Sequence, residues 1–331
     1  MKEWIARVAR QREFMIFVIV AVVTVAMTFS SPHFLTTGNI LALLLGLSIE
    51  AIVVVAMTNL MVSGGFDMSV GSVLAFTSAT TATFLRMGMP VVFAVLIGLS
   101  FGAIIGLING FFVAKVGLNP FVTTLSGLSL YRGLTLIITG GQNLAGLPRS
   151  FRAIGQPRFF GVQTPIIIAL VLIILGDLLL RNSRFFRQFY YIGGNEKAAR
   201  LSGIRVDRLK MLSYVLTGFF AAVAGVVMTS RLGAASVTAG TGMELRVITA
   251  VIIGGASLQG GEGSVLGSFL GILLMGLILN ALNLLGVSVY WQTFVVGATL
   301  LTAVVIDRLG KLKNEGQLVL PRFRFARKTT E

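Results

Sequence analysis

The chain has 331 residues, of which 55% are hydrophobic and only 12% are charged, and its mean hydropathy is +0.91. A soluble domain of this length cannot bury so much apolar surface, so the composition predicts an integral membrane protein. The net charge of +15 then reflects basic segments facing the cytoplasm and anionic membrane lipid, and nucleic acid is not expected as a partner. Because the sequence contains no cysteine, disulfides, thiolate metal sites and cysteine nucleophiles are excluded.

Ten apolar stretches are long enough, or nearly long enough, to cross a bilayer. They are residues 14–30, 40–63, 69–86, 91–115, 120–139, 164–181, 211–230, 245–258, 264–285 and 288–306. The pattern predicts an all-α membrane protein with about ten transmembrane helices in one domain, residues 1–313. A basic tail, 314–331, is predicted to be disordered and to face lipid. No small-residue cleavage pattern follows the first stretch, so we expect a retained span rather than a signal peptide.

The distribution of basic residues predicts the orientation. Alternating spans from a cytoplasmic N-terminus place 20 Lys and Arg inside and six outside. This bias favours a multi-pass protein of the bacterial inner membrane with both termini in the cytoplasm.

Glycine recurs at every fourth position in two of the stretches. The two series are Gly98, Gly102, Gly106 and Gly110, and Gly263, Gly267 and Gly271. This spacing predicts flat strips where neighbouring helices pack closely. In addition, GLING at 106–110 resembles GLILN at 276–280, and the two runs point in opposite directions across the membrane. The match suggests an inverted repeat of the kind found in transporters.

Residues 63–72, SGGFDMSVGS, separate two apolar stretches. Gly64 and Gly65 break the helix, and Asp67 or Ser69 can cap the next one. A helix break with polar groups in a membrane protein often lines a cavity. A tight cytoplasmic turn is the alternative, which simple alternation of spans favours.

Residues 118–133, LNPFVTTLSGLSLYRG, begin a helix that carries polar groups into the membrane. Asn119 is the predicted cap, with Pro120 at the first helical position. The charged Arg132 should face a water-filled path or a carboxylate, for which Glu50 is the candidate. Hydroxyls and amides with few charges suit a neutral polyhydroxylated solute better than an ion. The predicted substrate pathway comprises Glu50, Asn59, Asp67, Ser69, Asn119, Thr123, Thr124 and Arg132.

The segment from Arg181 to Lys210, here called the insert, is a polar and basic interruption. Its middle predicts one short helix that begins at Asn195 and ends at Gly203. Glu196 and Arg200 are spaced to support that helix as an i,i+4 pair. A small apolar patch is predicted from Ala198, Ala199 and Leu201. On these features alone, a site that receives force and an ordinary cytoplasmic loop remain equally open.

Residues 238–268 are rich in glycine and allow short or re-entrant helices. Glu244 and Arg246 are expected to lie at the outer mouth, where simple rim charges are the default interpretation.

Six motifs taken in order resemble the ribose-type permease family of bacterial ABC importers. They are GGFDMSVGS, NPFVTTLSGLSLYRG, YYIGGNEKAARLSGI, TAGTGMEL, AVIIGGASLQGGEGSVLGS and ALNLLGVSVYWQ, between about residues 60 and 292. The resemblance implies the permease fold of these importers, a second permease, two ATP-binding subunits and a periplasmic sugar-binding protein. It places the ATPase-coupling segment at Gly193, Gly194, Asn195, Glu196, Ala198, Ala199, Arg200, Leu201 and Gly203. Arg149, Arg152 and Glu244 are then candidates for docking the binding protein. Phe66 and Met68 depart from the smaller aliphatic residues usual in the family, which puts the particular sugar in doubt.

The sequence contains no GxxxxGK[ST] phosphate-binding loop, so the ATPase activity is expected in partner subunits. We therefore predict a transporter subunit that imports a monosaccharide, is not an enzyme and needs no cofactor. One alternative is a secondary transporter that couples a small polar solute to protons through Glu50 or Asp67. A membrane-embedded enzyme is disfavoured, because the single His33 and the lack of paired carboxylates leave no catalytic constellation. Both the sugar and the choice between homodimer and heterodimer remain open.

Overall fold

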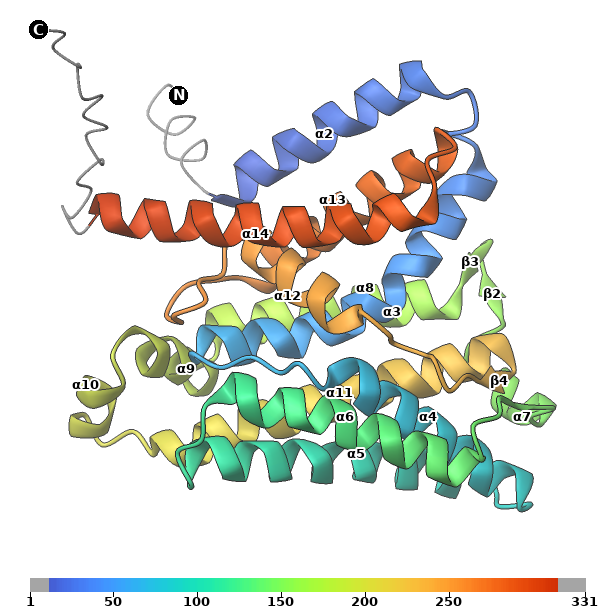
Figure 1. Cartoon of the computed structure of the whole chain (residues 1–331), viewed down its shortest axis with the longest axis horizontal. Helices are drawn as coiled ribbons and strands as arrows, with labels where there is room; N and C mark the ends of the chain where they lie inside the picture. Colours follow the sequence, from blue (N-terminus) through green and yellow to red (C-terminus); the bar gives the residue numbers. More distant parts are fainter. Residues whose placement is uncertain (1–11, 315–331) are drawn as a thin grey trace, which may run out of the picture.

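Helices account for most of the chain in the computed structural model, which describes residues 12–314 (Figure 1). The first half contains α2 (Arg12–Ser30), α3 (Thr37–Val62), α4 (Val70–Arg86), α5 (Val91–Ala114), α6 (Pro120–Thr139), β1 (Leu144–Ala145) and α7 (Arg149–Arg152). There follow β2 (Arg158–Phe159), β3 (Val162–Gln163), α8 (Thr164–Asn182), α9 (Arg184–Gly194) and α10 (Glu196–Leu201). The last part contains α11 (Val206–Leu232), β4 (Ala234–Ala235), α12 (Met243–Ile253), α13 (Val265–Leu284) and α14 (Val289–Asn314).

The predicted all-α membrane fold is confirmed. Within residues 12–314, eight helices are long and apolar enough to cross a membrane, namely α2, α3, α5, α6, α8, α11, α13 and α14. The other two predicted stretches form α4 and α12, which are shorter, at 17 and 11 residues. The predicted basic tail after Asn314 lies outside the described residues.

The bundle has two distinct ends (Figure 1). One end carries α9 and α10, together with the start of α2 and the end of α14, and we call it the insert end. The opposite end carries α7 and two small antiparallel sheets, one pairing β1 with β4 and the other pairing β2 with β3. We call it the hairpin end. The second half of α3, residues 47–62, is buried almost throughout and forms part of the centre of the bundle.

The two short helices begin beside each other inside the bundle. A methyl group on Gly71, in the first turn of α4, would lie 2.1 Å from the carbonyl oxygen of Gly240, just before α12. From there α4 runs towards the hairpin end and α12 towards the insert end (Figure 1). In each half of the chain a long helix, a break, a short helix and two further long helices follow in order. This order, in opposite directions, agrees with the inverted repeat predicted from the sequence.

Both glycine series lie where the sequence predicts close helix packing. In α5, methyl groups on Gly102 and Gly106 would lie 2.5 and 2.2 Å from backbone oxygens of α11. Towards α12, a methyl group on Gly271 of α13 would lie 2.0 Å from the Ala250 oxygen. Only a residue without a side chain allows backbones to approach this closely.

Candidate functional site

The insert folds as two helices rather than one. As predicted, Asn195 caps α10, because its side chain accepts a hydrogen bond of 3.0 Å from the Ala198 nitrogen. Gly203 adopts the left-handed conformation just after the helix ends, with φ +82°. Helix α9 was not predicted from the sequence. Its signal is present, since Phe186, Phe189 and Tyr190 follow helical spacing and their side chains pack into the protein.

Ion pairs hold α10 against the start of α11. Arg200 donates to Glu196 at 2.9 Å and to Asp207 at 2.5 Å, and Lys210 donates to Glu196 at 2.5 Å. Lys115, at the end of α5, lies 3.6 Å from Asp207. Partial burial raises the pKa of Glu196, but hydrogen bonds from Lys210 and Arg200 outweigh it, so the pKa lies below its ordinary value. The ion pairs of Glu196 therefore persist throughout the neutral pH range.

The predicted apolar patch on α10 is divided between two faces. Ala199 is buried in a cluster with Val62, Phe189, Ile192 and other residues of the insert end. Leu201, in contrast, is 90% exposed, and Ala198 is also exposed. A six-residue helix has only one buried alanine, so the other apolar side chains point away from the bundle.

Glycines from three segments that are distant in sequence meet at the end of α9. A methyl group on Gly193 would lie 1.9 Å from the Val62 oxygen and 2.4 Å from the Gly261 nitrogen. One on Gly260 would lie 2.7 Å from the Gly193 Cα and 2.8 Å from the Gly64 nitrogen. The Gly261 nitrogen also donates to the Val62 oxygen at 2.9 Å. We call Gly64, Gly193, Gly260 and Gly261 the glycine junction.

The glycine junction connects the insert directly to the ends of two other segments. Gly64 begins the break that leads to α4, and Gly260 lies in the turn between α12 and α13. The Tyr190 hydroxyl adds a hydrogen bond of 2.7 Å to the Gly263 oxygen in the same turn. The end of α9 therefore contacts, through backbone atoms, the break that precedes α4 and the turn that follows α12.

The break at residues 63–69 is buried inside the bundle. Asp67 is only 1% exposed and Ser69 is fully buried. Asp67 accepts hydrogen bonds from the nitrogen and hydroxyl of Ser69, at 2.7 and 2.6 Å, and from Asn109 at 3.3 Å. Thr124 accepts a hydrogen bond of 3.0 Å from the Met68 nitrogen, which ties the break to α6. Backbone N–H and C=O groups without hydrogen-bond partners are too costly in lipid. The bundle avoids this cost because it buries the break among polar partners.

The predicted pairing of Arg132 with Glu50 is wrong. Arg132 donates to the backbone oxygens of Val237 and Ala239, at 2.7 and 2.9 Å. Glu50 instead forms an ion pair of 2.6 Å with Arg246. The reason is that α6 packs against α4, whereas α3 packs against α12, so each charge meets a different neighbour. Arg132 thus holds the series of turns that precedes α12.

The other predicted pathway residues lie in different surroundings. As predicted, Asn119 caps α6, accepting a hydrogen bond of 2.8 Å from the Phe121 nitrogen. Thr123 lines a pocket of about 360 Å³ between α5 and α6. Glu50 lines a second pocket of about 360 Å³, with Arg246, Asn280 and other residues of α3 and α13. Asn59 is 5% exposed, and within the described part of the chain its side-chain amide has no hydrogen-bond partner.

The three predicted docking residues do not share one surface. Arg149 is exposed and Arg152 half-buried, both in α7 at the hairpin end. Glu244 is only 8% exposed, and lies in the first turn of α12 inside the bundle. Simple alternation of spans places it at the outer mouth, but the segment before α12 runs inward. This burial excludes Glu244 from a docking surface on this chain.

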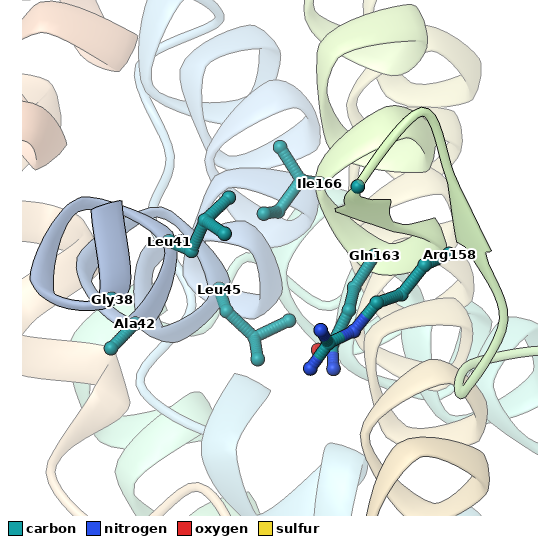
Figure 2. Close-up of a pocket in the computed structure, with 8 residues that line it drawn as sticks. Gly38, Leu41, Ala42, Leu45, Arg158, Gln163 and Ile166 are labelled. Carbon is teal, nitrogen blue, oxygen red and sulfur yellow. The ribbon is translucent and has the colours of Figure 1, made fainter.

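The hairpin end also contains a pocket of about 290 Å³ beside α3 (Figure 2). Figure 2 shows Arg158 and Gln163, from β2 and β3, pointing towards Leu45. The segments that connect helices at this end, residues 31–36, 87–90, 140–163, 233–242 and 285–288, contain three arginines and no acidic residue. The hairpin end is therefore basic.

Sequence comparisons place the chain among transport permeases. The family described as "Branched-chain amino acid transport system / permease component" matches residues 39–304. The chain is 41% identical to the ribose import permease protein of Bacillus subtilis over 295 residues, which cover 88% of this chain and 90% of the relative. It is 38% identical to the L-arabinose transport system permease protein of Escherichia coli over 291 residues, 88% of this chain and 89% of the relative. The chain belongs to this permease family.

Membership of this permease family establishes the general class of the protein. The chain is the membrane permease component of an ABC import system and not an enzyme. Such a permease works with ATPase and substrate-binding partners in general. The apolar helices and the family together describe a multi-pass protein of the inner membrane. The resemblance seen in the sequence motifs is thereby confirmed.

Proposed function

We propose that this permease carries a monosaccharide across the inner membrane. The observation that carries this proposal is the identity of 34–41% with permeases named for ribose, L-arabinose and D-allose, each over most of its length. Two ATP-binding subunits supply the energy, a second permease completes the membrane assembly and a periplasmic binding protein delivers the sugar. The insert end faces the cytoplasm, in agreement with the excess of basic residues there.

In this proposal α10 docks into the ATPase, and Leu201 is the main apolar contact. Leu201 is 90% exposed on a polar helix and Ala198 is exposed as well, so α10 offers a small apolar contact to a partner. The ion pairs of Glu196 and Arg200 orient α10, and the glycine junction passes its movement to the breaks before α4 and after α12. The coupling segment therefore comprises the predicted residues from Gly193 to Gly203.

Leu201→Asp is expected to abolish stable co-purification with the ATP-binding subunit and to lower sugar uptake at least about tenfold, because a charge replaces the apolar contact. The folded permease should be retained, since Leu201 is 90% exposed in the chain itself. Leu35→Asp is the matched control, because Leu35 is 57% exposed and lies in the connection between α2 and α3. Pull-down of a tagged ATP-binding subunit and uptake of labelled sugar measure both effects. Normal co-purification of the Leu201→Asp variant would refute this docking mode.

The sugar passes polar residues of α3, of the break before α4, and of α6 with its N-cap. This pathway comprises Glu50, Asn59, Asp67, Ser69, Asn119, Thr123, Thr124 and Arg132. This pathway is supported by the free-energy cost of burying amide, hydroxyl and charged groups in a membrane, because such groups are usually retained for function. The unpartnered amide of Asn59 and the pockets beside Thr123 and Glu50 add to it.

The basic hairpin end receives the binding protein, with Arg149 and Arg152 as docking residues. Because its connecting segments carry arginines and no acidic residues, it favours a partner with acidic surface groups. Arg149→Glu combined with Arg152→Glu is expected to raise the concentration of binding protein that half-activates ATP hydrolysis by about tenfold or more. Arg158→Glu at the same end is the control for net charge. An unchanged half-activating concentration in the double variant, titrated at low salt, would contradict the assignment.

A further inference from the structure

The pocket between α5 and α6 is neutral, although it lies beside a buried carboxylate. Its polar lining comes from Asn109, Asn119, Thr123, Ser126 and Tyr131, and the remainder is apolar, including Phe112. Among the residues that the structure describes, no lysine, arginine, aspartate or glutamate lines it. Its volume of about 360 Å³ falls within the range of small-molecule sites, which combine an apolar lining with a few placed polar groups.

A chain of hydrogen bonds behind the pocket fixes the direction of its polar groups. The NH₂ group of Asn109 donates a hydrogen bond of 3.3 Å to Asp67. The same NH₂ donates to the Ser69 hydroxyl at 3.0 Å. The Asn109 oxygen then accepts from the Tyr131 hydroxyl at 3.0 Å. The Tyr131 proton is thereby used inside the protein, and its oxygen remains available as an acceptor.

The two hydroxyls nearer the surface of α6 are arranged in the same way. The Thr123 hydroxyl donates to the Asn119 oxygen at 3.0 Å, and the Ser126 hydroxyl donates to the Val122 oxygen at 2.8 Å. Their protons are therefore also occupied within the helix. The pocket thus offers several hydroxyl oxygens as acceptors and no charge, and it suits a ligand that is rich in hydroxyl donors.

We propose that this α5–α6 pocket is a contact site for one neutral monosaccharide during transport, with Asn109 and Tyr131 held in place by Asp67. This inference rests on the proposed function and makes it more specific, because Asn109, Ser126 and Tyr131 are not among the pathway residues predicted from the sequence. It also separates two substrate classes. A free amino acid carries two charges that need partners in a membrane, and the pocket provides none. Asp67 is a positioning residue, since it acts through Asn109.

Labelling of single cysteines tests the site directly, because the natural chain has no cysteine. Ser126→Cys lines the pocket, whereas Ser129→Cys is an exposed serine of the same helix outside it. Each variant is assembled with its ATP-binding subunits and binding protein in nanodiscs and treated with a charged methanethiosulfonate. D-ribose, L-arabinose, D-allose and L-leucine are added in separate arms.

The site predicts that the Ser126→Cys variant reacts and that a transported sugar slows its labelling at least about threefold, while L-leucine has no effect. The labelling rate of Ser129→Cys should not respond to sugar. No reaction at Ser126→Cys, equal rates with and without sugar, or protection by L-leucine would overturn the proposal. Sugar uptake by the unmodified assembly is measured in parallel. Uptake without protection refutes only the pocket, whereas no uptake of any monosaccharide refutes the proposed function.

A second variant tests the hydrogen-bonding role without a cysteine. Tyr131→Phe keeps the ring and removes the hydroxyl, so we expect uptake of the preferred sugar to fall about three- to tenfold. The ratio between uptake of the preferred sugar and uptake of the other sugars should change as well. A purely structural defect would lower the uptake of all sugars alike and leave this ratio unchanged. Tyr214→Phe is the matched control, because its buried hydroxyl donates to the Phe66 oxygen and does not line the pocket. An unchanged sugar ratio in Tyr131→Phe would contradict the site.

Discussion

Gly193→Ala is expected to reduce sugar uptake about tenfold or more, whereas Gly194→Ala should leave it close to that of the wild type. A methyl group on Gly193 would lie 1.9 Å from the Val62 oxygen and 2.4 Å from the Gly261 nitrogen. Both are backbone atoms, so no side-chain rotation relieves the clash. Overpacking of this kind costs about 1–3 kcal/mol, and about 1.4 kcal/mol shifts an equilibrium tenfold. At Gly194, no atom of residues 12–314 lies within 4 Å of the added methyl group.

The glycine junction also predicts which activity is lost. ATP hydrolysis by the assembled complex should persist in Gly193→Ala, because α10 still docks, while transport fails. Uptake of labelled sugar and ATP hydrolysis in nanodiscs are compared on equal amounts of folded permease, measured by fluorescence-detected size exclusion. Tyr190→Phe, which removes the 2.7 Å hydrogen bond to Gly263, provides a milder test if Gly193→Ala does not fold. Equal sugar uptake by the Gly193→Ala and Gly194→Ala variants would show that the glycine junction does not transmit the movement of α10.

Arg246→Ala is expected to destabilise the permease by about 3–5 kcal/mol, so that little folded protein is recovered. The variant leaves the Glu50 carboxylate without the 2.6 Å partner in a setting where its side chain is only 14% exposed. An unpaired charge of this kind is far more costly than the loss of the pair itself. The midpoint temperature in detergent, measured by fluorescence-detected size exclusion, reports the change.

Removing both charges should restore part of that loss. Glu50→Gln combined with Arg246→Gln leaves no unpaired charge and is expected to be more stable than Arg246→Ala. Lys115→Ala is the control, because its pair with Asp207 is longer, at 3.6 Å, with side chains 49% and 28% exposed. Such a pair contributes about 1 kcal/mol or less. A double variant as unstable as Arg246→Ala would argue that packing, rather than charge, explains the defect.

The sequence alone predicts the apolar stretches and the short helix α10, because both depend on local chemistry. Apolar length identifies the spanning stretches, and Asn195 and Gly203 mark the limits of α10 by their capping preferences. Helix α9 is not predicted, because the basic composition of the insert as a whole obscures the helical spacing of the aromatic residues in α9. A test for periodicity within the insert identifies it.

Tertiary relations could not be obtained in the same way. The sequence identifies Glu50 and Arg132 as intramembrane charges, but only the packing of α3 on α12 and of α6 on α4 determines that they have different partners. Alternation of complete spans places Glu244 at the outer mouth, whereas it is buried in the first turn of α12. The difference arises because the segment before this short helix enters the bundle, which a count of complete spans ignores. The glycine junction unites residues nearly 200 positions apart, Gly64 and Gly260, which no local pattern relates.

Sugar uptake into proteoliposomes tests the central claim most directly. The vesicles contain this permease with its ATP-binding subunits and enclosed ATP, and binding protein with labelled monosaccharide is added outside. The account predicts accumulation that requires ATP, is unaffected by a protonophore and is lost in Leu201→Asp. Uptake that proceeds without ATP and collapses with the protonophore would contradict it and favour an ion-coupled transporter instead.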